Sequence, residues 1–422
     1  MTEQHALYAL NFVWRKTVEG KMREKQLTRR RFLKDLTLTC TYSTFGVHTL
    51  AARNVWGKTP KGAGSKESAT MEYRTLGKTG LKISALSFGV MRLSEPAVLF
   101  QALDMGINYF DTAHRYQNGN NEKMLGKVLK QYGRSKVFIA TKIPPYYKRF
   151  GNKRLNHQKS METMMEKSLR RLQTDYVDVL FLHNITNPEW PLHEEMLGFC
   201  QKMKKIGKAR FAGISFHTTG QTYVDTVDRI LEAGFYDVFL ATLNYKSPPA
   251  HIQALKRARH KGVGIVAMKT QAGGYKPEEN ISLNPHQAAL KWVLDNQFVD
   301  CAIPGMVNRQ QLAENAGVIG KKIGWSDRKT LAAYYDEVKD RYCLRCGSCT
   351  SSCKKQVDIS TIHRCLMYWE GYQDFDLGRA TYRRLPPTEN ALACMGCTAP
   401  TCNCSNGIKI SERMRHAHIH FT

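Results

Sequence analysis

The sequence predicts a (β/α)8 TIM barrel followed by a small cysteine-rich domain. The first observation is a repeat that begins near residue 71, where short apolar runs rich in β-branched residues alternate with amphipathic segments of helical period. The second is the uneven use of cysteine, because nine of the 12 cysteines follow residue 342. The barrel therefore does not depend on thiols, whereas the C-terminal domain does.

Eight runs have the length and composition of buried strands. They are residues 83–89, 107–112, 137–142, 177–183, 209–215, 238–244, 264–269 and 301–305. Helical segments such as NEKMLGKVLKQYG and NPHQAALKWVLDN lie between them. Strands that alternate with helices pair in parallel, and eight of them in about 250 residues favour a closed barrel over an open doubly wound sheet. The open sheet is disfavoured further because no G-x-G-x-x-G motif follows the first strand.

We expect three regions: an N-terminal extension over residues 1–70, the barrel over 71–322, and a helical connection with the cysteine-rich domain over 323–422. Hydrophobic residues make up 42% of the chain, enough for a packed globular protein. No apolar run reaches the roughly 18 residues of a membrane-spanning helix. The net charge of +27 is spread along the chain without a nucleic-acid motif, so it favours anionic ligands or membrane surfaces over nucleic acid.

The stretch Thr28–Lys34, TRRRFLK, resembles the twin-arginine export signal. A moderately apolar stretch follows at Leu36–Ala52, with small residues suited to cleavage at its end. Residues 53–70 are polar and glycine-rich, which is typical of a linker. Twin-arginine export carries proteins that are already folded, so the resemblance implies export to the periplasm. The alternative is a basic leader on a cytoplasmic protein.

Polar side chains end three of the expected strands. Asp111 ends the second strand, Lys142 the third and His183 the fourth, and Tyr116 lies five residues beyond Asp111. Because the C-terminal ends of barrel strands surround one mouth, these four side chains are expected to converge there. Each of them alone has an ordinary structural explanation, but the combination predicts an active site.

Over roughly residues 71–320 the chain resembles the aldo/keto reductase family. The motifs that carry the resemblance are MEYRTLGKTGLKISALSFG, FDTAHRYQNGNNE, FIATK, DVLFLH, GISFH and AIPGM. The family's catalytic Asp, Tyr, Lys and His match Asp111, Tyr116, Lys142 and His183 in order and context. The resemblance implies an oxidoreductase that interconverts an aldehyde or ketone with its alcohol by hydride transfer.

Carbonyl reduction explains why these residue types occur together. Tyr116 would give a proton to the developing alkoxide and would take it back in the reverse direction. The ammonium of Lys142 is expected to lower the pKa of the phenol, and Asp111 to keep that ammonium charged. His183 would donate to the carbonyl oxygen and orient it.

The resemblance also implies NADP or NAD across the barrel mouth. The expected contacts are Ser215, Met268, Gly305, Arg309, Glu314 and Asn315. Gly305 and Gln311 stand where NADP-specific members carry cations, which weakens the case for a 2′-phosphate clamp. Arg309 could substitute, so the sequence leaves NADP and NAD open.

The C-terminal cysteines form two groups. The first is Cys343, Cys346, Cys349 and Cys353, and the second is Cys394, Cys397, Cys402 and Cys404. The first resembles the ferredoxin run that holds a 4Fe-4S cluster, in which the fourth Cys can serve the other cluster of a pair. The irregular second group leaves one or two clusters open. The resemblance is to the aldo/keto reductase subgroup with a C-terminal, largely helical, ferredoxin-like iron–sulfur domain.

Two other uses of these thiols stay open, structural zinc and periplasmic disulfides. Four-thiolate zinc sites favour pairs of C-x2-C without a third close thiol, and thiols two residues apart cannot all pair without strain. A rival function also stays open, a non-catalytic electron-transfer or assembly partner that uses the barrel as a scaffold. A small-molecule carbonyl or alcohol is the expected substrate of the enzyme, and an electron-transfer protein its expected partner.

Overall fold

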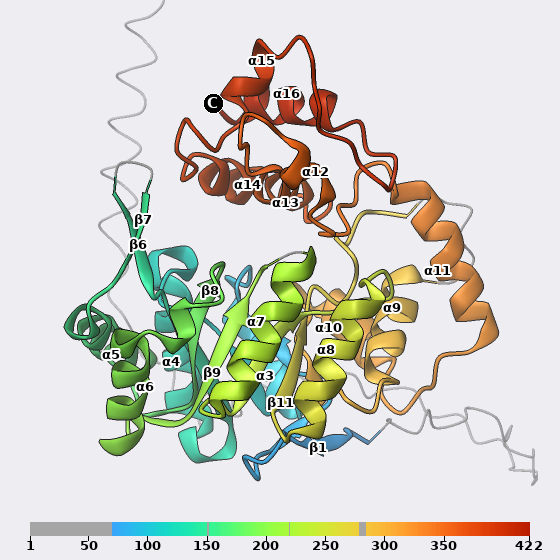
Figure 1. Cartoon of the computed structure of the whole chain (residues 1–422). Coiled ribbons are helices and arrows are strands. Elements are labelled where there is room, and N and C mark those ends of the chain that lie inside the picture. The colour runs from blue at the N-terminus through green and yellow to red at the C-terminus, as the bar shows by residue number, and fades with distance from the viewer. Residues whose placement is uncertain (1–69, 150–151, 219, 278–283) are drawn as a thin grey trace, which may run out of the picture. The chain divides into compact units, whose positions relative to one another are not determined.

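The structure, a computed structural model, describes residues 70–149, 152–218, 220–277 and 284–422 (Figure 1). The described residues belong to one compact unit. The twin-arginine segment lies outside the described residues. In the described ranges, no helix has both the length and the apolar character needed to cross a membrane.

Eight parallel strands form the central sheet, and the predicted barrel is confirmed. They are β3 (Phe88–Gly89), β4 (Tyr109–Asp111), β5 (Phe138–Ile143), β8 (Val177–Ile185), β9 (Ala209–Phe216), β10 (Val238–Thr242), β11 (Gly264–Met268) and β12 (Cys301–Ala302). Their order is β12-β11-β10-β9-β8-β5-β4-β3, and parallel bridges Leu86–Ala302 and Gly89–Gly305 join the two edges. Each strand overlaps one of the eight runs that the sequence predicts, and β5, β8 and β9 end one or two residues beyond theirs.

Side chains along each strand point alternately into and out of the barrel, and this divides the apolar core into two layers. Val179 and Phe181 of β8 pack inside the barrel, whereas Leu180 and Leu182 pack outward against the helices. Successive side chains of a strand point to opposite faces, so a fully buried strand needs an apolar residue at every position. This is why the strand runs are continuously apolar.

An antiparallel hairpin precedes the barrel. It consists of β1 (Tyr73–Thr75) and β2 (Lys82–Ser84), and its apolar side chains join the inner core of the barrel. Gly77 in its turn has a φ of 50°, and a Cβ there would lie 2.3 Å from the backbone nitrogen of Gly264. Only glycine allows this close approach, which seats the hairpin at the N-terminal end of β11.

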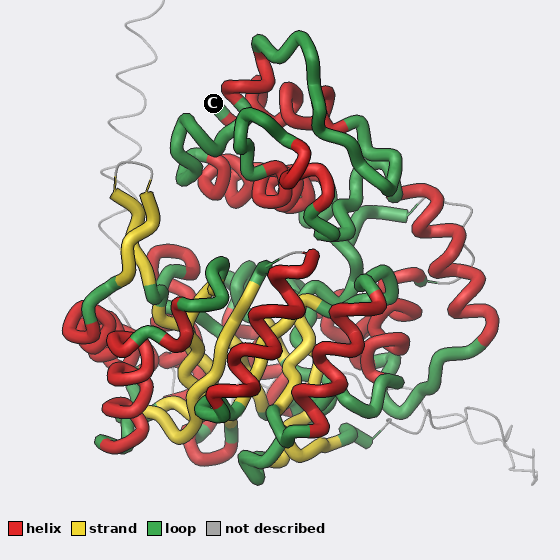
Figure 2. The backbone as a smooth tube through the Cα atoms, viewed as in Figure 1, coloured by secondary structure: helices red, strands yellow, loops and turns green. Residues whose placement is uncertain are grey.

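Helices cover the outside of the sheet (Figure 2). They are α3 (Pro96–Asp104), α4 (Asn120–Tyr132), α5 (Gln158–Leu172), α6 (Glu194–Lys205), α7 (Gly220–Ala233), α8 (Pro249–His260), α9 (Pro285–Leu294) and α10 (Arg309–Ala316). The start of α9 shows why such boundaries can be read locally. Pro285 is its first residue, and the Asn284 side chain accepts from the backbone N–H of His286 at 2.9 Å.

A basic segment of the chain follows β5 and forms an antiparallel hairpin of β6 (Tyr146–Arg149) and β7 (Asn152–Leu155). Tyr146 at its start is buried, and Leu155 at its end packs against the barrel core.

In the C-terminal region the described residues form helices joined by loops. The helix α11 (Trp325–Val338) packs along α9, with an ion pair of 2.7 Å between Lys291 and Asp327. After it come α12 (Ser348–Ser352), α13 (Ile359–Glu370), α14 (Phe375–Tyr382), α15 (Leu392–Met395) and α16 (Ile410–Phe421). Buried side chains of α13 and α16 form a separate small core on which several of the cysteines pack. The predicted helical and loop character of this region is confirmed.

Candidate active site

The four predicted catalytic residues come together at one end of the barrel. Lys142 of β5 and Asp111 of β4 are buried and form an ion pair. The Lys142 ammonium also donates to the carbonyl oxygen of Thr112 at 2.7 Å and lies 3.3 Å from the Tyr116 hydroxyl oxygen. The ring of His183 meets the Tyr116 ring edge-on, with centroids 5.7 Å apart.

Tyr116 is held by a tight turn rather than by a strand. It begins the 3-10 helix η1 (Tyr116–Gly119), in which Gln117 and Asn118 have positive φ angles of 47° and 54°. The Gln117 amide donates to the carbonyl oxygen of Leu93 at 3.1 Å. Asn121 donates to the carbonyl oxygen of Val90 at 2.6 Å and thereby fixes the helix that follows. These bonds offset the cost of the left-handed residues and fix the position of the phenol.

Burial controls the charge state of the ion pair. It raises the pKa of Asp111, although the Lys142 charge opposes this, and it lowers the pKa of Lys142, although the Asp111 charge opposes this. The second carboxylate oxygen of Asp111 is buried without a hydrogen-bond partner among the described residues. The pair is therefore expensive in folding free energy, which is typical of a site kept for function.

Tyr116 and His183 are both held in their neutral forms. Burial, then the Asp111 charge and the neighbouring phenols Tyr368 and Tyr372, raise the pKa of Tyr116 well above its usual value. The pKa is thus raised where the sequence led us to expect a lowered one, because burial of the phenol and the Asp111 charge favour its protonated form. Burial, then Lys142, lower the pKa of His183. A protonated phenol and a neutral imidazole each carry a proton that can be donated to an oxygen atom.

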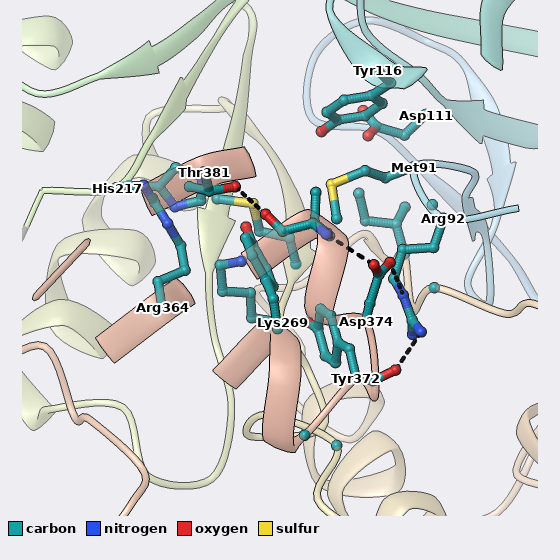
Figure 3. A pocket seen from close by; sticks show the side chains of 18 of the residues that line it. Met91, Arg92, Asp111, Tyr116, His217, Lys269, Arg364, Tyr372, Asp374 and Thr381 are labelled. Atoms are coloured by element: carbon teal, nitrogen blue, oxygen red, sulfur yellow. Dashed lines mark hydrogen bonds and ion pairs between the residues drawn. The ribbon is translucent and has the colours of Figure 1, made fainter. Parts of the chain in front are cut away.

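A large cavity lies in front of this group. Its volume is about 1540 Å³, and its lining includes Tyr116 and His183 from the barrel together with Arg364, Tyr368 and Tyr372 from the C-terminal region. One small ligand usually occupies roughly 300–1,000 Å³, so this cavity has room for a dinucleotide and a substrate. Figure 3 shows the pocket with Tyr116 and Asp111 at one side and Arg364, Tyr372 and Asp374 around it.

The C-terminal contribution to the cavity is the feature that sequence reasoning missed. Arg364, Tyr368 and Tyr372 follow one another at intervals of four residues, and the first two belong to α13. A cation and two aromatic residues at helical spacing on one face could have marked that face as a ligand surface. Nothing in the sequence says, however, that this face meets the barrel mouth.

The expected cofactor contacts are only partly placed around the cavity. Met268, Gly305, Glu314 and Asn315 line it, and Asn315 accepts from the Gln271 amide at 2.9 Å. Ser215 is buried in β9, next to the mouth but outside the lining. Arg309 is exposed at the start of α10 and also lies outside the lining. The expected substitution of Arg309 for a phosphate clamp thus gains no support.

The cysteines fall into two groups in space. The charges of Cys353, Cys402 and Cys397 all raise the pKa of Cys394, after burial as the main cause. In the same way, Cys346 and Cys404 raise the pKa of Cys343. Cys349 packs in the small helical core beside them. No group of three or more Cys, His, Asp or Glu has metal-binding geometry among the described residues.

The comparisons with known proteins bear on the barrel. The sequence model of the aldo/keto reductase family matches residues 93–285. L-galactose dehydrogenase of Arabidopsis thaliana is 32% identical over 292 residues, which cover 59% of this chain and 88% of the relative. The chain belongs to the aldo/keto reductase family. It is an aldo/keto reductase type oxidoreductase.

A second relative and a solved structure are also similar to this chain. A probable voltage-gated potassium channel subunit beta of Oryza sativa subsp. japonica is 36% identical over 300 residues, which cover 58% of this chain and 90% of the relative. The holo form of aldo-keto reductase AKR11C1 from Bacillus halodurans superimposes with a TM-score of 0.54 at 23% identity, over 63% of this chain and 96% of that one. The structural likeness supports the barrel fold.

Proposed function

We propose that this reductase interconverts an aldehyde or ketone with its alcohol, using Tyr116 as the general acid and base. The observation that supports this most is the convergence of Asp111, Tyr116, Lys142 and His183 on a cavity large enough for two ligands. A chain that only served as a scaffold would have no need to bury an expensive ion pair beside a phenol.

In the direction of carbonyl reduction, each of the four residues has a separate role. A nicotinamide dinucleotide held by residues of the cavity wall such as Met268, Gly305 and Asn315 would supply the hydride for this reduction. His183 donates its remaining N–H to the carbonyl oxygen and orients it, and Tyr116 transfers its proton to the same oxygen as negative charge develops there. Lys142 donates to the phenol oxygen and stabilises it once the proton has left, while Asp111 holds the ammonium in place.

The test is the Tyr116→Phe variant, which removes one oxygen atom and leaves the ring. We expect it to lose carbonyl reduction by about 10²- to 10⁴-fold, the usual worth of a general acid. Dinucleotide binding, followed by fluorescence titration, should stay within a few-fold of the wild-type value. Reduction that survives this change unaltered would refute the role of Tyr116.

The channel-subunit relative favours a second candidate, a scaffold or assembly partner. Under that function, binding to a partner protein would persist in Tyr116→Phe while no carbonyl compound would be reduced by the wild type. The same variant therefore separates the two functions.

For the cofactor, the lining favours NAD over NADP. Gln311 and Glu314 line the cavity near Gly305, whereas Arg309 does not. A 2′-phosphate needs cationic or strongly donating partners, and a carboxylate such as Glu314 repels it. Parallel titrations with NADH and NADPH test this, and tighter binding of NADPH would reverse the assignment.

The proposal extends to an iron–sulfur module in the C-terminal region. The two groups of thiols and the ferredoxin-like spacing support two 4Fe-4S clusters with exchanged fourth ligands. One cluster would use Cys343, Cys346, Cys349 and Cys404, and the other Cys353, Cys394, Cys397 and Cys402. The clusters would store or pass single electrons to a partner protein, or they would hold the helical region together.

Iron and acid-labile sulfide in anaerobically purified protein test this module. About eight irons per chain are expected for two clusters, and about four after Cys353→Ala. Cys365→Ala is the control, because Cys365 is fully buried in the apolar core around α13 and belongs to neither proposed ligand set. Stoichiometric zinc without sulfide, or thiols found paired as disulfides, would overturn the assignment.

We place the mature protein in the periplasm, exported through the twin-arginine route with its cofactors already bound. The support is the segment Thr28–Lys34 together with a C-terminal region suited to clusters. Replacing Arg29 and Arg30 by Lys should retain the protein in the cytoplasm, which cell fractionation would detect. Equal distribution of wild type and variant would favour a cytoplasmic enzyme.

A further inference from the structure

Two partly buried cations in the cavity wall have no acidic partner among the described residues. Arg92 pairs with Asp374 at 3.7 Å and Arg171 with Glu122 at 3.1 Å. The other unpaired cations of the lining, Arg115, Lys276 and Arg384, are exposed to solvent. Lys269 and Arg364 also line the cavity, but neither has a carboxylate within 4 Å among the described residues. An unpaired charge in such a place is costly unless a ligand neutralises it.

The two cations come from different parts of the chain. Lys269 directly follows β11, with a left-handed backbone φ of 56° that turns it out of the strand. Its ammonium lies 5.5 Å from the centre of the Tyr368 ring of α13. Arg364 is on α13 itself, and its Nε is buried without a hydrogen-bond partner among the described residues. Figure 3 shows both side chains in the same pocket, with Arg364 close to His217.

The surroundings of Lys269 are positive as well. Burial, then the charges of Arg364 and Arg345, lower the pKa of Lys269. The same Arg364 charge contributes to the lowered pKa of His183, so its field reaches the catalytic group. A bound anion would offset the positive charges around Lys269. Guanidinium and ammonium groups bind carboxylate and phosphate oxygens through charge-assisted hydrogen bonds.

We propose that Lys269 and Arg364 bind a carboxylate or phosphate group of the carbonyl substrate, so that the substrate site is completed by α13 of the C-terminal region. This inference rests on the proposed reductase function. The cavity joins these two cations to Tyr116 and His183, which allows one molecule to place its anionic end on the first pair and its carbonyl on the second. An alternative source of the same chemistry is the pyrophosphate of the dinucleotide, since Lys269 follows Met268 of the expected nicotinamide contact.

The experiment compares two aldehydes of the same shape, 4-carboxybenzaldehyde and methyl 4-formylbenzoate. The full chain, with its cofactors, should reduce the acid with a kcat/KM about 10- to 100-fold above that of the ester, the range expected for hydrogen bonds to charged groups. Arg364→Met and Lys269→Met should each remove most of this preference and leave the ester rate within about threefold. A wild type that prefers the ester would overturn the proposal.

Arg379→Met is the matched control. Arg379 is an exposed cation of α14 that pairs with Asp376 at 3.1 Å and does not line the cavity. It should keep the preference for the acid. If Arg364→Met and Lys269→Met instead weaken NADH binding and leave the ratio of acid to ester unchanged, the anion is the dinucleotide pyrophosphate and the substrate assignment is wrong.

A binding measurement separates this inference from the reductase function. Calorimetry with 4-methylbenzoate, which has no carbonyl group to reduce, should show binding to the wild type and a loss of about tenfold or more in Arg364→Met. If neither aldehyde is reduced while 4-methylbenzoate still binds in this way, the anion site stands and the reductase function fails. Absence of binding at both wild type and variants would overturn the anion site.

Discussion

Lys142 and Asp111 form a buried ion pair that is present although burial disfavours both of its charges. Burial shifts the pKa of each group toward its uncharged form, and the partner charge only partly compensates. A buried ion pair of this kind often contributes less to stability than apolar residues of similar volume. The position of the pair beside Tyr116 explains why it is nevertheless present.

The double variant Asp111→Leu with Lys142→Met should therefore be about as stable as the wild type or more stable. Lys142→Met alone should lose about 3–5 kcal/mol, because it leaves the Asp111 carboxylate buried without its partner. Urea denaturation measures both. All these variants should be inactive in carbonyl reduction, so a double variant as unstable as the single one would show that the pair stabilises the fold.

Among residues, the convergence of Asp111, Tyr116, Lys142 and His183 could be predicted from the sequence, but the positions of Lys269 and Arg364 could not. Asp111, Lys142 and His183 stand at strand ends, where the barrel topology alone brings them together. Arg364 reaches the site from a helix 181 residues beyond His183 in the chain, through a docking of surfaces that no local pattern encodes.

At the level of secondary structure, the packing of α4 against α5 positions the turn that holds Tyr116. Gly126 lies where α4 meets α5, and a Cβ there would be 2.4 Å from the carbonyl oxygen of Arg171. Arg171 in turn donates to Glu122 at 3.1 Å and to the carbonyl oxygen of His114 at 3.0 Å, two residues before Tyr116. A shift of α5 would therefore be passed to the turn that holds the phenol.

Gly126→Ala should destabilise the protein by about 1–3 kcal/mol and lower kcat/KM, because backbone atoms must move to admit the methyl group. Thermal unfolding and steady-state kinetics test the two effects. Gly324→Ala is the control, since a Cβ at Gly324 has no neighbour closer than 3.6 Å and its φ is negative. If Gly126→Ala were as stable and active as this control, the contact of α4 with α5 would not constrain the site.

Buried histidines make the whole molecule sensitive to acid. Burial is the main cause that lowers the pKa of His114 to about 4, of His251 to about 4 and of His363 to about 3. In the unfolded chain these groups bind protons below about pH 6.5, whereas the folded protein resists protonation. Stability should therefore fall as pH decreases from about 6.5 to 4, because the unfolded state takes up more protons.

His363→Leu should reduce this acid sensitivity and raise stability at pH 5. Both ring nitrogens of His363 are buried without hydrogen-bond partners among the described residues, so the substitution removes two unsatisfied polar atoms. Denaturation midpoints measured from pH 7 to pH 4 would show a shallower decline than in the wild type. An unchanged slope would mean that His363 finds a hydrogen-bonding partner in solution.

The sequence by itself determined the barrel, the order of its strands, the convergence of Asp111, Tyr116, Lys142 and His183, and the division into a thiol-poor and a thiol-rich region. The strands follow from the period of the hydrophobic residues, which is a local signal. The polar residues at the strand ends come together because the barrel topology brings all these ends to one mouth. Only the tertiary structure decided the neutral state of Tyr116, the hairpin β6–β7 and the place of α13 in the cavity wall. Each of these depends on burial or on contact between distant segments, and neither quantity exists until the chain has folded.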